Sequence, residues 1–260
     1  MPLEIPTGLH SQEPCNMRIL LVNDDGFDEP GLRALEETFA DHDTITVAPC
    51  CHHSGAGMSL NLYSPLKVRK HSENRFSVEG TPVDCVKLAL GELCGGKIPD
   101  LVLSGINPGA NLANNTWYSG TVAAATEAAL WLIPAMAVSQ EYRSEPDFSS
   151  SAAVTRELVD NRVFSFAEPG TLLNVNVPLE FTGSYTATKL GSFSREIPFT
   201  SDNEGTLFRY GPYEVQPVRE AEGTDVHALR EGNVSITHLA ASRIHPEVPK
   251  GILSWCSRRH

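Results

Sequence analysis

The stretch that decides the fold is Arg18-Ile19-Leu20-Leu21-Val22-Asn23-Asp24-Asp25-Gly26. After Arg18 it begins with four apolar residues, which is typical of a parallel strand buried on both faces of a sheet. The apolar run then stops abruptly at four residues that favour turns. We therefore expect a buried strand over residues 18–22, followed directly by a loop that presents two adjacent carboxylates.

Outward from this strand, apolar runs and helical stripes alternate along the chain. Strand-like runs lie at 44–47, 101–103, 135–138 and 172–177, and helix-like segments at about 30–39, 82–90, 119–132 and 149–166. Such alternation is typical of a parallel sheet with connecting helices. The predicted fold class is therefore α/β, a Rossmann-like, mainly parallel sheet with helices on both faces.

After about residue 180 the pattern changes to short alternating segments between glycine and proline breaks. These segments, at 184–190, 206–218 and 233–237, predict C-terminal β-hairpin extensions. The domain organisation expected from this pattern has three parts. Residues 1–16 are a disordered extension or an expression remnant, 17–182 the Rossmann-like catalytic core, and 183–260 hairpins with a C-terminal oligomerisation segment.

Composition limits the function classes. The 260 residues suit one large α/β domain, and a formal net charge of −12 argues against a basic face that binds duplex nucleic acid. There is no apolar run long enough for a membrane span, and the N-terminus lacks the pattern of a secretory signal. The six cysteines include no C-x-x-C pair, which favours reduced thiols in a cytoplasmic protein.

The adjacent carboxylates of Asp24 and Asp25 carry the first indication of chemistry. Two such groups at a strand end repel each other, and a divalent cation beside them relieves that repulsion. The alternative is an ordinary turn, because Asn, Asp and Gly all favour turns. In an open α/β sheet this position lies where ligands bind.

Three further loops follow strands or open a helix. Ser54-Gly55-Ala56-Gly57 offers backbone N–H groups and a hydroxyl to an oxyanion, Ser104 to Asn111 includes Asn107 as a neutral oxygen ligand, and Ser119-Gly120-Thr121 opens a helix at which an anion can bind. Each also has a plain structural interpretation, as a flexible loop, a turn and an N-cap respectively. Their joint order along the chain is more specific than any one of them.

In that order the sequence closely resembles the SurE family of nucleotidases. The matching stretches are MRILLVNDDG at 17–26, Ser54-Gly55, GTPVDCV at 80–86, SGIN at 104–107, YSGTVAAA at 118–125, NVNVP at 174–178 and GNVSIT at 232–237. This chain departs from the family in having Cys51-His52-His53 before the Ser-Gly pair and Pro108 after Asn107. Residues after 240 match the family poorly. We interpret the two histidines as loop residues rather than as zinc ligands.

The resemblance implies a phosphomonoesterase acting on nucleoside 5′- and 3′-monophosphates, with one divalent cation per subunit, Mg²⁺ or Mn²⁺. It implies Asp24, Asp25, Ser54 and Asn107 as metal ligands, Asp24 and Asp25 as catalytic residues, and Ser54, Gly55, Asn107, Ser119, Gly120 and Thr121 as phosphate-binding residues. It also implies a homodimer or homotetramer joined by exchanged C-terminal elements. Asp24 is expected either to accept the proton of the attacking water or to attack phosphorus itself, and both routes stay open.

Other classes compete with this interpretation. A signalling receiver domain also has an acidic pair after its first strand, but it requires an Asp after the third strand and a later Lys that are not found here. A non-catalytic nucleotide-binding or phosphate-binding module stays open as an alternative. The dinucleotide fingerprint is incomplete, since the third glycine is missing, and no P-loop occurs.

Overall fold

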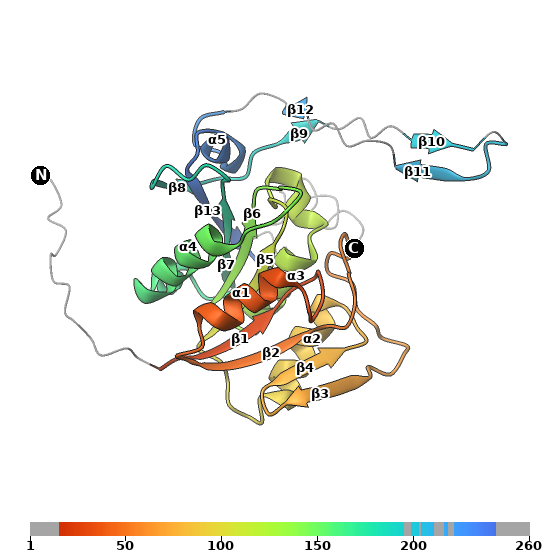
Figure 1. The fold of residues 1–260 in the computed structure, drawn as a ribbon, viewed down its shortest axis with the longest axis vertical. Coiled ribbons are helices and arrows are strands. Elements are labelled where there is room, and N and C mark those ends of the chain that lie inside the picture. The colour runs from red at the N-terminus through yellow and green to blue at the C-terminus, as the bar shows by residue number, and fades with distance from the viewer. Residues whose placement is uncertain (1–15, 195–198, 203, 211–215, 218–220, 243–260) are drawn as a thin grey trace, which may run out of the picture.

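A computed structural model of the chain describes residues 16–194, 199–202, 204–210, 216–217 and 221–242. Its centre is a nine-stranded sheet in the order β3-β4-β2-β1-β5-β6-β7-β13-β8 (Figure 1). The strands of this sheet are β1 (Arg18–Val22), β2 (Asp43–Pro49), β3 (Val68–Ser72), β4 (Arg75–Val78), β5 (Leu101–Asn107), β6 (Ala135–Gln140), β7 (Thr171–Val177), β8 (Tyr185–Thr188) and β13 (Val234–Ala240).

The six strands from β4 to β7 in this order are parallel, as predicted. β3 adds antiparallel to β4 at one edge, whereas β13 pairs antiparallel with β7 and parallel with β8 at the other. In the sheet, β2 lies on one side of β1 and β5 lies on the other. The direction in which successive strands are added to the sheet therefore reverses at β1. A crevice at the carboxyl ends of β1 and β5 is therefore the expected ligand site.

Helices cover both faces of the sheet (Figure 1). They are α1 (Pro30–Thr38), α2 (Pro82–Leu88), α3 (Gly120–Leu130), α4 (Ser149–Asp160) and α5 (Asp225–Arg230), with short helical turns at Ala89–Leu93, Ala113–Trp117 and Val163–Phe166. In β1, Ile19 and Leu21 pack with α1 and α4, whereas Leu20 and Val22 pack with α2 and α3. The two cores explain why every apolar residue of this strand is buried, and the predicted fold class is confirmed.

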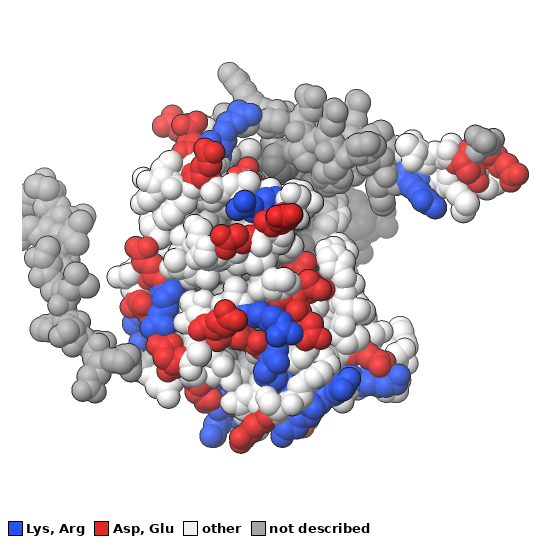
Figure 2. All heavy atoms as spheres, in the orientation of Figure 1, with Lys and Arg blue, Asp and Glu red and all other residues white. Residues whose placement is uncertain are grey.

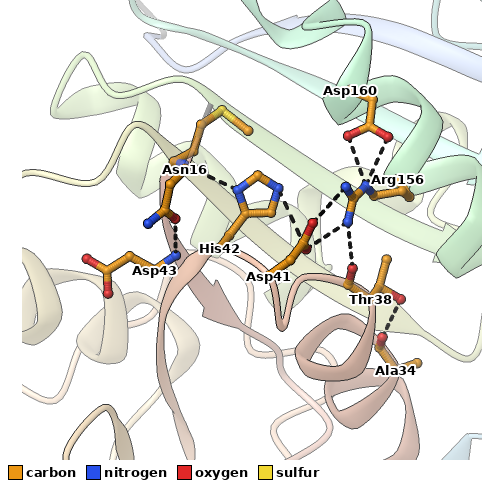
Figure 3. Close-up of polar contacts among 9 residues, drawn as sticks. Asn16, Ala34, Thr38, Asp41, His42, Asp43, Arg156 and Asp160 are labelled. Carbon is orange, nitrogen blue, oxygen red and sulfur yellow. Dashed lines mark hydrogen bonds and ion pairs between the residues drawn. The ribbon is translucent and has the colours of Figure 1, made fainter. Parts of the chain in front are cut away.

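Arg156 of α4 links α4 to the end of α1, the helix that packs beside it on the same face of the sheet. Its guanidinium donates to both carboxylate oxygens of Asp41, at 2.8 and 2.9 Å, and to the carbonyl of Thr38 at the end of α1 (Figure 3). It also donates to Asp160 one turn further along α4. The bidentate geometry fixes the angle of α4 against α1 better than one contact would.

Beyond residue 182 the structure refines the expected organisation. The short segments at 184–190 and 233–237 are not a separate hairpin layer, because β8 and β13 complete the central sheet. Outside that sheet, β10 (Phe199–Ser201) pairs with β11 (Phe208–Tyr210), and β9 (Phe193–Ser194) pairs with β12 (Gln216–Pro217), in an extension that leaves the body of the protein (Figure 1). The expectations for residues 1–15 and 243–260 lie outside the described residues.

One predicted helix is shorter than expected. The apolar spacing predicted a helix over 149–166, but α4 ends at Asp160, and Arg162 adopts a left-handed φ of +53° before the turn at Val163–Phe166.

The surface agrees with the acidic composition. On the face shown in Figure 2, acidic and basic side chains are interspersed and form no broad basic area among the residues coloured. Within the described ranges, no helix is both long and apolar enough to cross a bilayer.

Candidate functional site

Three loops meet at the carboxyl ends of β1, β2 and β5, and the loop after β5 leads into the start of α3 there. The loop after β2 reaches the loop after β1 through a hydrogen bond from His53 N to Asp24 O, at 2.8 Å. The start of α3 reaches the same residue through Thr121 Oγ1, which donates to Asp24 Oδ1 at 2.6 Å. Gly57 N donates to Tyr118 O at 3.1 Å, which joins the loop after β2 to the segment before α3. The convergence expected for parallel strands is therefore present.

The turn after β1 is closed by the side chain of Asn23. Its Nδ2 donates to Gly26 O at 2.8 Å, and its Oδ1 accepts from Gly26 N at 3.3 Å. Gly26 has a φ of +135°, which a residue with a side chain rarely adopts. This local arrangement explains how the short sequence after β1 fixes the two acids between Asn23 and Gly26.

The side chain of Asp24, from the loop after β1, lies at the N-terminus of α3. The residue is 3% exposed, and the hydroxyl of Thr121 donates to its carboxylate. A Cβ added at Gly120 would lie only 2.7 Å from Asp24 Cβ and 2.9 Å from its Oδ2, so the absence of a side chain there makes room for the acid. Burial nevertheless raises the pKa of Asp24 above its ordinary value, against the effect of this donor.

Asp25 lies beside Asp24 and is also buried. Burial, and secondly the neighbouring charge of Asp24, raise the pKa of Asp25 to about 7. The exposed imidazole of His52, whose Nδ1 lies 3.6 Å from Asp25 Oδ1, lowers that pKa only in part. The two carboxylates therefore form a site that is short of positive charge.

The lack of positive charge beside Asp24 and Asp25 predicts how the stability of the metal-free protein depends on pH. Because folding raises the pKa of Asp25 to about 7, the folded state holds its proton more tightly than the unfolded state, and the free energy of unfolding falls as pH rises from about 4 to about 7. Asp25→Asn should remove part of that loss and stabilise the metal-free protein at pH 8 by about 1 to 3 kcal/mol. Urea unfolding in chelator at pH 5 and pH 8 measures this, and equal pH dependence of the two proteins would contradict it.

Asn107 and Ser54 stand on the two flanking loops. Asn107 is the last residue of β5, which pairs with β1, and its Nδ2 donates to Gly109 O at 2.5 Å, which leaves its side-chain oxygen as the atom that could bind a cation. Ser54 follows His53, the residue bonded to the Asp24 backbone, and it is exposed. Gly55 has a φ of +79°, and nothing lies within 4 Å of the position that a Cβ would take there, so this turn is open. The structure thus places the four expected ligands on three loops that touch one another.

Two of the hydroxyls expected to bind phosphate, those of Ser119 and Thr121, are already engaged. Ser119 caps α3 by accepting from Val122 N at 3.1 Å, and Thr121 donates to Asp24 and is fully buried. In this arrangement they orient the helix start and the acid. The sequence did not point to Thr121 as a partner of Asp24, because the two residues are 97 positions apart.

The donor set suits a hard divalent cation. Among the described residues, no three or more His, Cys, Asp or Glu side chains lie together as a group that could hold a metal ion. Two carboxylates whose burial raises their pKa, with an amide oxygen and a hydroxyl on adjoining loops, match the oxygen ligands that Mg²⁺ and Mn²⁺ prefer. The residues therefore fit the group that the resemblance implies.

The site loops depend on a polar network that sequence reasoning missed. Asn111 N donates to Asn176 Oδ1 at 2.7 Å, its carbonyl accepts from Asn174 Nδ2 at 2.8 Å, and its Nδ2 donates to Ser139 Oγ at 2.8 Å. All four residues are buried. Two asparagines inside an apolar strand, at 174 and 176, were the available indication, because buried amides require partners.

Comparison with known proteins covers the whole site. Residues 19–197 match the family model described as "Survival protein SurE". The chain is 41% identical over 249 residues to "5'-nucleotidase SurE" of Vibrio parahaemolyticus, covering 92% of this chain and 94% of that protein. The crystal structure of SurE protein from Aquifex aeolicus matches with a TM-score of 0.80 at 35% identity, covering 92% of this chain and 99% of that one.

Proposed function

Because the chain belongs to the SurE family, we propose that it is a phosphomonoesterase that hydrolyses nucleoside 5′-monophosphates, and also 3′-monophosphates, to nucleoside and phosphate. The observation that carries the proposal is the buried pair Asp24 and Asp25 at the point where the strand order reverses. Burying two adjacent carboxylates is unfavourable unless a cation joins them, so their position argues for a role beyond the fold. The name of the Vibrio relative supports nucleotides as substrates.

Asp24, Asp25, Asn107 and Ser54 are the residues that would hold the cation. When bound there, a divalent cation, Mg²⁺ or Mn²⁺, would supply positive charge to the phosphate oxygens and to the attacking water. The backbone N–H groups near Ser54-Gly55, together with Asn107, are proposed to bind the remaining oxygens. The α3 start at Ser119-Gly120-Thr121 is proposed to contribute through its backbone and dipole, because the hydroxyls of Ser119 and Thr121 are already engaged.

The protein's own part in the reaction centres on Asp24. Thr121 holds one oxygen of the Asp24 carboxylate at 2.6 Å, which fixes the orientation of the acid. Asp24 then either accepts the proton of the attacking water or attacks phosphorus itself. In the first route the water oxygen bonds to phosphorus as the ester bond to the nucleoside oxygen breaks, and the proton that Asp24 accepted passes to that oxygen. In the second route the same ester bond breaks as an aspartyl phosphate forms on Asp24, the nucleoside oxygen takes a proton from solvent, and water then hydrolyses the aspartyl phosphate to release phosphate.

A phosphate-release panel tests the proposal. Purified protein is stripped with chelator and assayed on 5′- and 3′-nucleoside monophosphates and on phenyl phosphate, each with Mg²⁺, with Mn²⁺ or with chelator alone. We expect nucleotides to be hydrolysed only with added metal, and a metal-induced rise in Tm of several degrees in the same samples. Binding of nucleotide without phosphate release under every metal condition would favour a non-catalytic module instead.

Assembly into a homodimer or homotetramer is part of the same proposal. The extension formed by β9 to β12 leaves the body of the protein, and Phe199, Leu207 and Phe208 on it are each more than half exposed. A two-stranded hairpin alone in water is only marginally stable, so a second copy is a reasonable place for it to pack. Light scattering at micromolar concentration measures the mass, and a monomer would contradict this part.

A further inference from the structure

One buried carboxylate outside the candidate site joins two distant parts of the chain. Asp225, the first residue of α5, is fully buried. Its Oδ2 accepts a hydrogen bond from Ala113 N at 2.8 Å, and its Oδ1 accepts from Gly191 N at 2.7 Å and from Val226 N at 2.9 Å. All three of these partners are backbone N–H groups.

The first of these contacts reaches the candidate site. Ala113 lies in the loop between Asn107 and Ser119, which connects a proposed metal ligand to the start of α3. Ala113 has a φ of +48°, a left-handed conformation that is uncommon for a residue with a side chain, and it is fully buried, so its N–H requires a hydrogen-bond partner. Near its end the same loop carries Trp117 and Tyr118, both more than half exposed, and aromatic faces of this kind are what nucleobases stack on.

The second contact reaches the base of the C-terminal extension. Gly191 lies two residues before β9, where that extension begins, and Asp225 N donates to Lys189 O at 3.0 Å on the same short segment. A Cβ at Gly191 would lie 3.1 Å from Asp225 Oδ1 and 2.9 Å from a methyl carbon of Val226. Residues 189–191 therefore pack closely around the Asp225 carboxylate, so a shift of this segment displaces the carboxylate and a shift of the carboxylate displaces the segment.

We propose that Asp225 is a positioning residue that couples the base of the C-terminal extension to the nucleoside-binding side of the active-site loop. The inference rests on the proposed function, because it assigns the loop at 108–118 to the nucleoside part of the substrate. Loss of the carboxylate frees the Ala113 N–H and loosens the loop, whereas the acids that would bind metal stay in place. The expected defect is therefore in nucleotide recognition rather than in phosphate chemistry.

Two variants test this from opposite sides of the carboxylate. Asp225→Asn turns one acceptor oxygen into a donor, which must then face an N–H group. Gly191→Ala pushes on Asp225 from the extension without touching the loop. Both should raise the KM for a nucleoside monophosphate about tenfold, the size expected for loss of one hydrogen bond to a buried charge, with kcat and the KM for phenyl phosphate changed less than about twofold. The double variant should be no worse than Asp225→Asn, since both act through one group.

Glu127→Gln is the matched control. Glu127 is also a buried carboxylate, 2% exposed, but its partners are Lys87 at 2.7 Å and Trp131 at 2.8 Å. Glu127→Gln should lower Tm without changing the ratio of the KM for the nucleoside monophosphate to the KM for phenyl phosphate. Equal losses on both substrates in Asp225→Asn and Glu127→Gln would overturn the inference, because a purely structural role predicts that result.

Amide hydrogen exchange keeps the test independent of activity. Exchange at Ala113 should become faster in both Asp225→Asn and Gly191→Ala, and unchanged exchange at Ala113 in Gly191→Ala would overturn the coupling. If Asp225→Asn does not fold, Gly191→Ala alone decides. If the wild-type protein releases no phosphate from nucleotides, the proposed function fails, while the exchange measurement still decides whether Asp225 couples the two segments.

Discussion

Replacement of Asp24 by asparagine is expected to lower phosphate release from nucleotides by more than about 100-fold. Loss of a residue that merely supports a metal ligand costs about 10- to 100-fold, and loss of a charged ligand should exceed that. Asparagine keeps an acceptor oxygen for the Thr121 hydroxyl, which donates to Asp24 at 2.6 Å, so the turn and the start of α3 have no reason to move.

The melting temperature distinguishes a loss of activity caused by removal of the Asp24 carboxylate from one caused by misfolding. Burial raises the pKa of Asp24, which means that the ionised acid destabilises the metal-free fold at neutral pH. Asp24→Asn should therefore match or exceed the wild-type Tm in chelator, while the rise in Tm on adding Mn²⁺ should disappear. Asp28→Asn is the control, because Asp28 is an exposed acid four residues along that pairs with Arg33 at the surface. Activity within tenfold of wild type in Asp24→Asn would reject Asp24 as a catalytic or metal-binding residue.

The sequence was sufficient for the part of the fold that local pattern and strand order determine. The apolar run 19–22 between polar segments predicted a strand buried on both faces, and the structure confirms it as part of β1. Because the carboxyl ends of parallel strands lie at one edge, the loops after 22, 49 and 107 could be expected to meet. That expectation required no knowledge of side-chain contacts.

Contacts between distant residues could not be predicted in the same way. The start of α3 offers N–H groups to any anion, and nothing in its sequence tells whether that anion is a phosphate or the carboxylate of Asp24. The alternating pattern of residues 233–237 likewise fits any half-exposed strand, and only the pairing with β7 places β13 in the central sheet. Asp225 gave no indication at all, because its partners are backbone N–H groups that every residue type except proline carries.

A methyl group at position 120 should disable the site almost as effectively as loss of the acid. Gly120 is the first residue of α3, and a Cβ there would lie 2.7 Å from Asp24 Cβ and 2.9 Å from its Oδ2, closer than such atoms can approach. The Asp24 carboxylate is the group that must yield, since α3 is packed into the core along its length. A displacement of about 1 Å in a catalytic group can reduce turnover about 100-fold, so Gly120→Ala should lower kcat by about 10- to 100-fold.

The metal dependence of Gly120→Ala identifies the cause. A displaced ligand weakens metal binding, so a higher Mn²⁺ concentration should restore part of the activity, whereas it should restore none in Asp24→Asn. Gly91→Ala is the matched control, because Gly91 has nothing within 4 Å of the added Cβ, and alanine there should be neutral or stabilising by up to about 1 kcal/mol. If Gly120→Ala keeps wild-type kcat and metal affinity while Gly91→Ala behaves as expected, the carboxylate of Asp24 does not need the position that the start of α3 gives it, and its role in holding a cation is wrong.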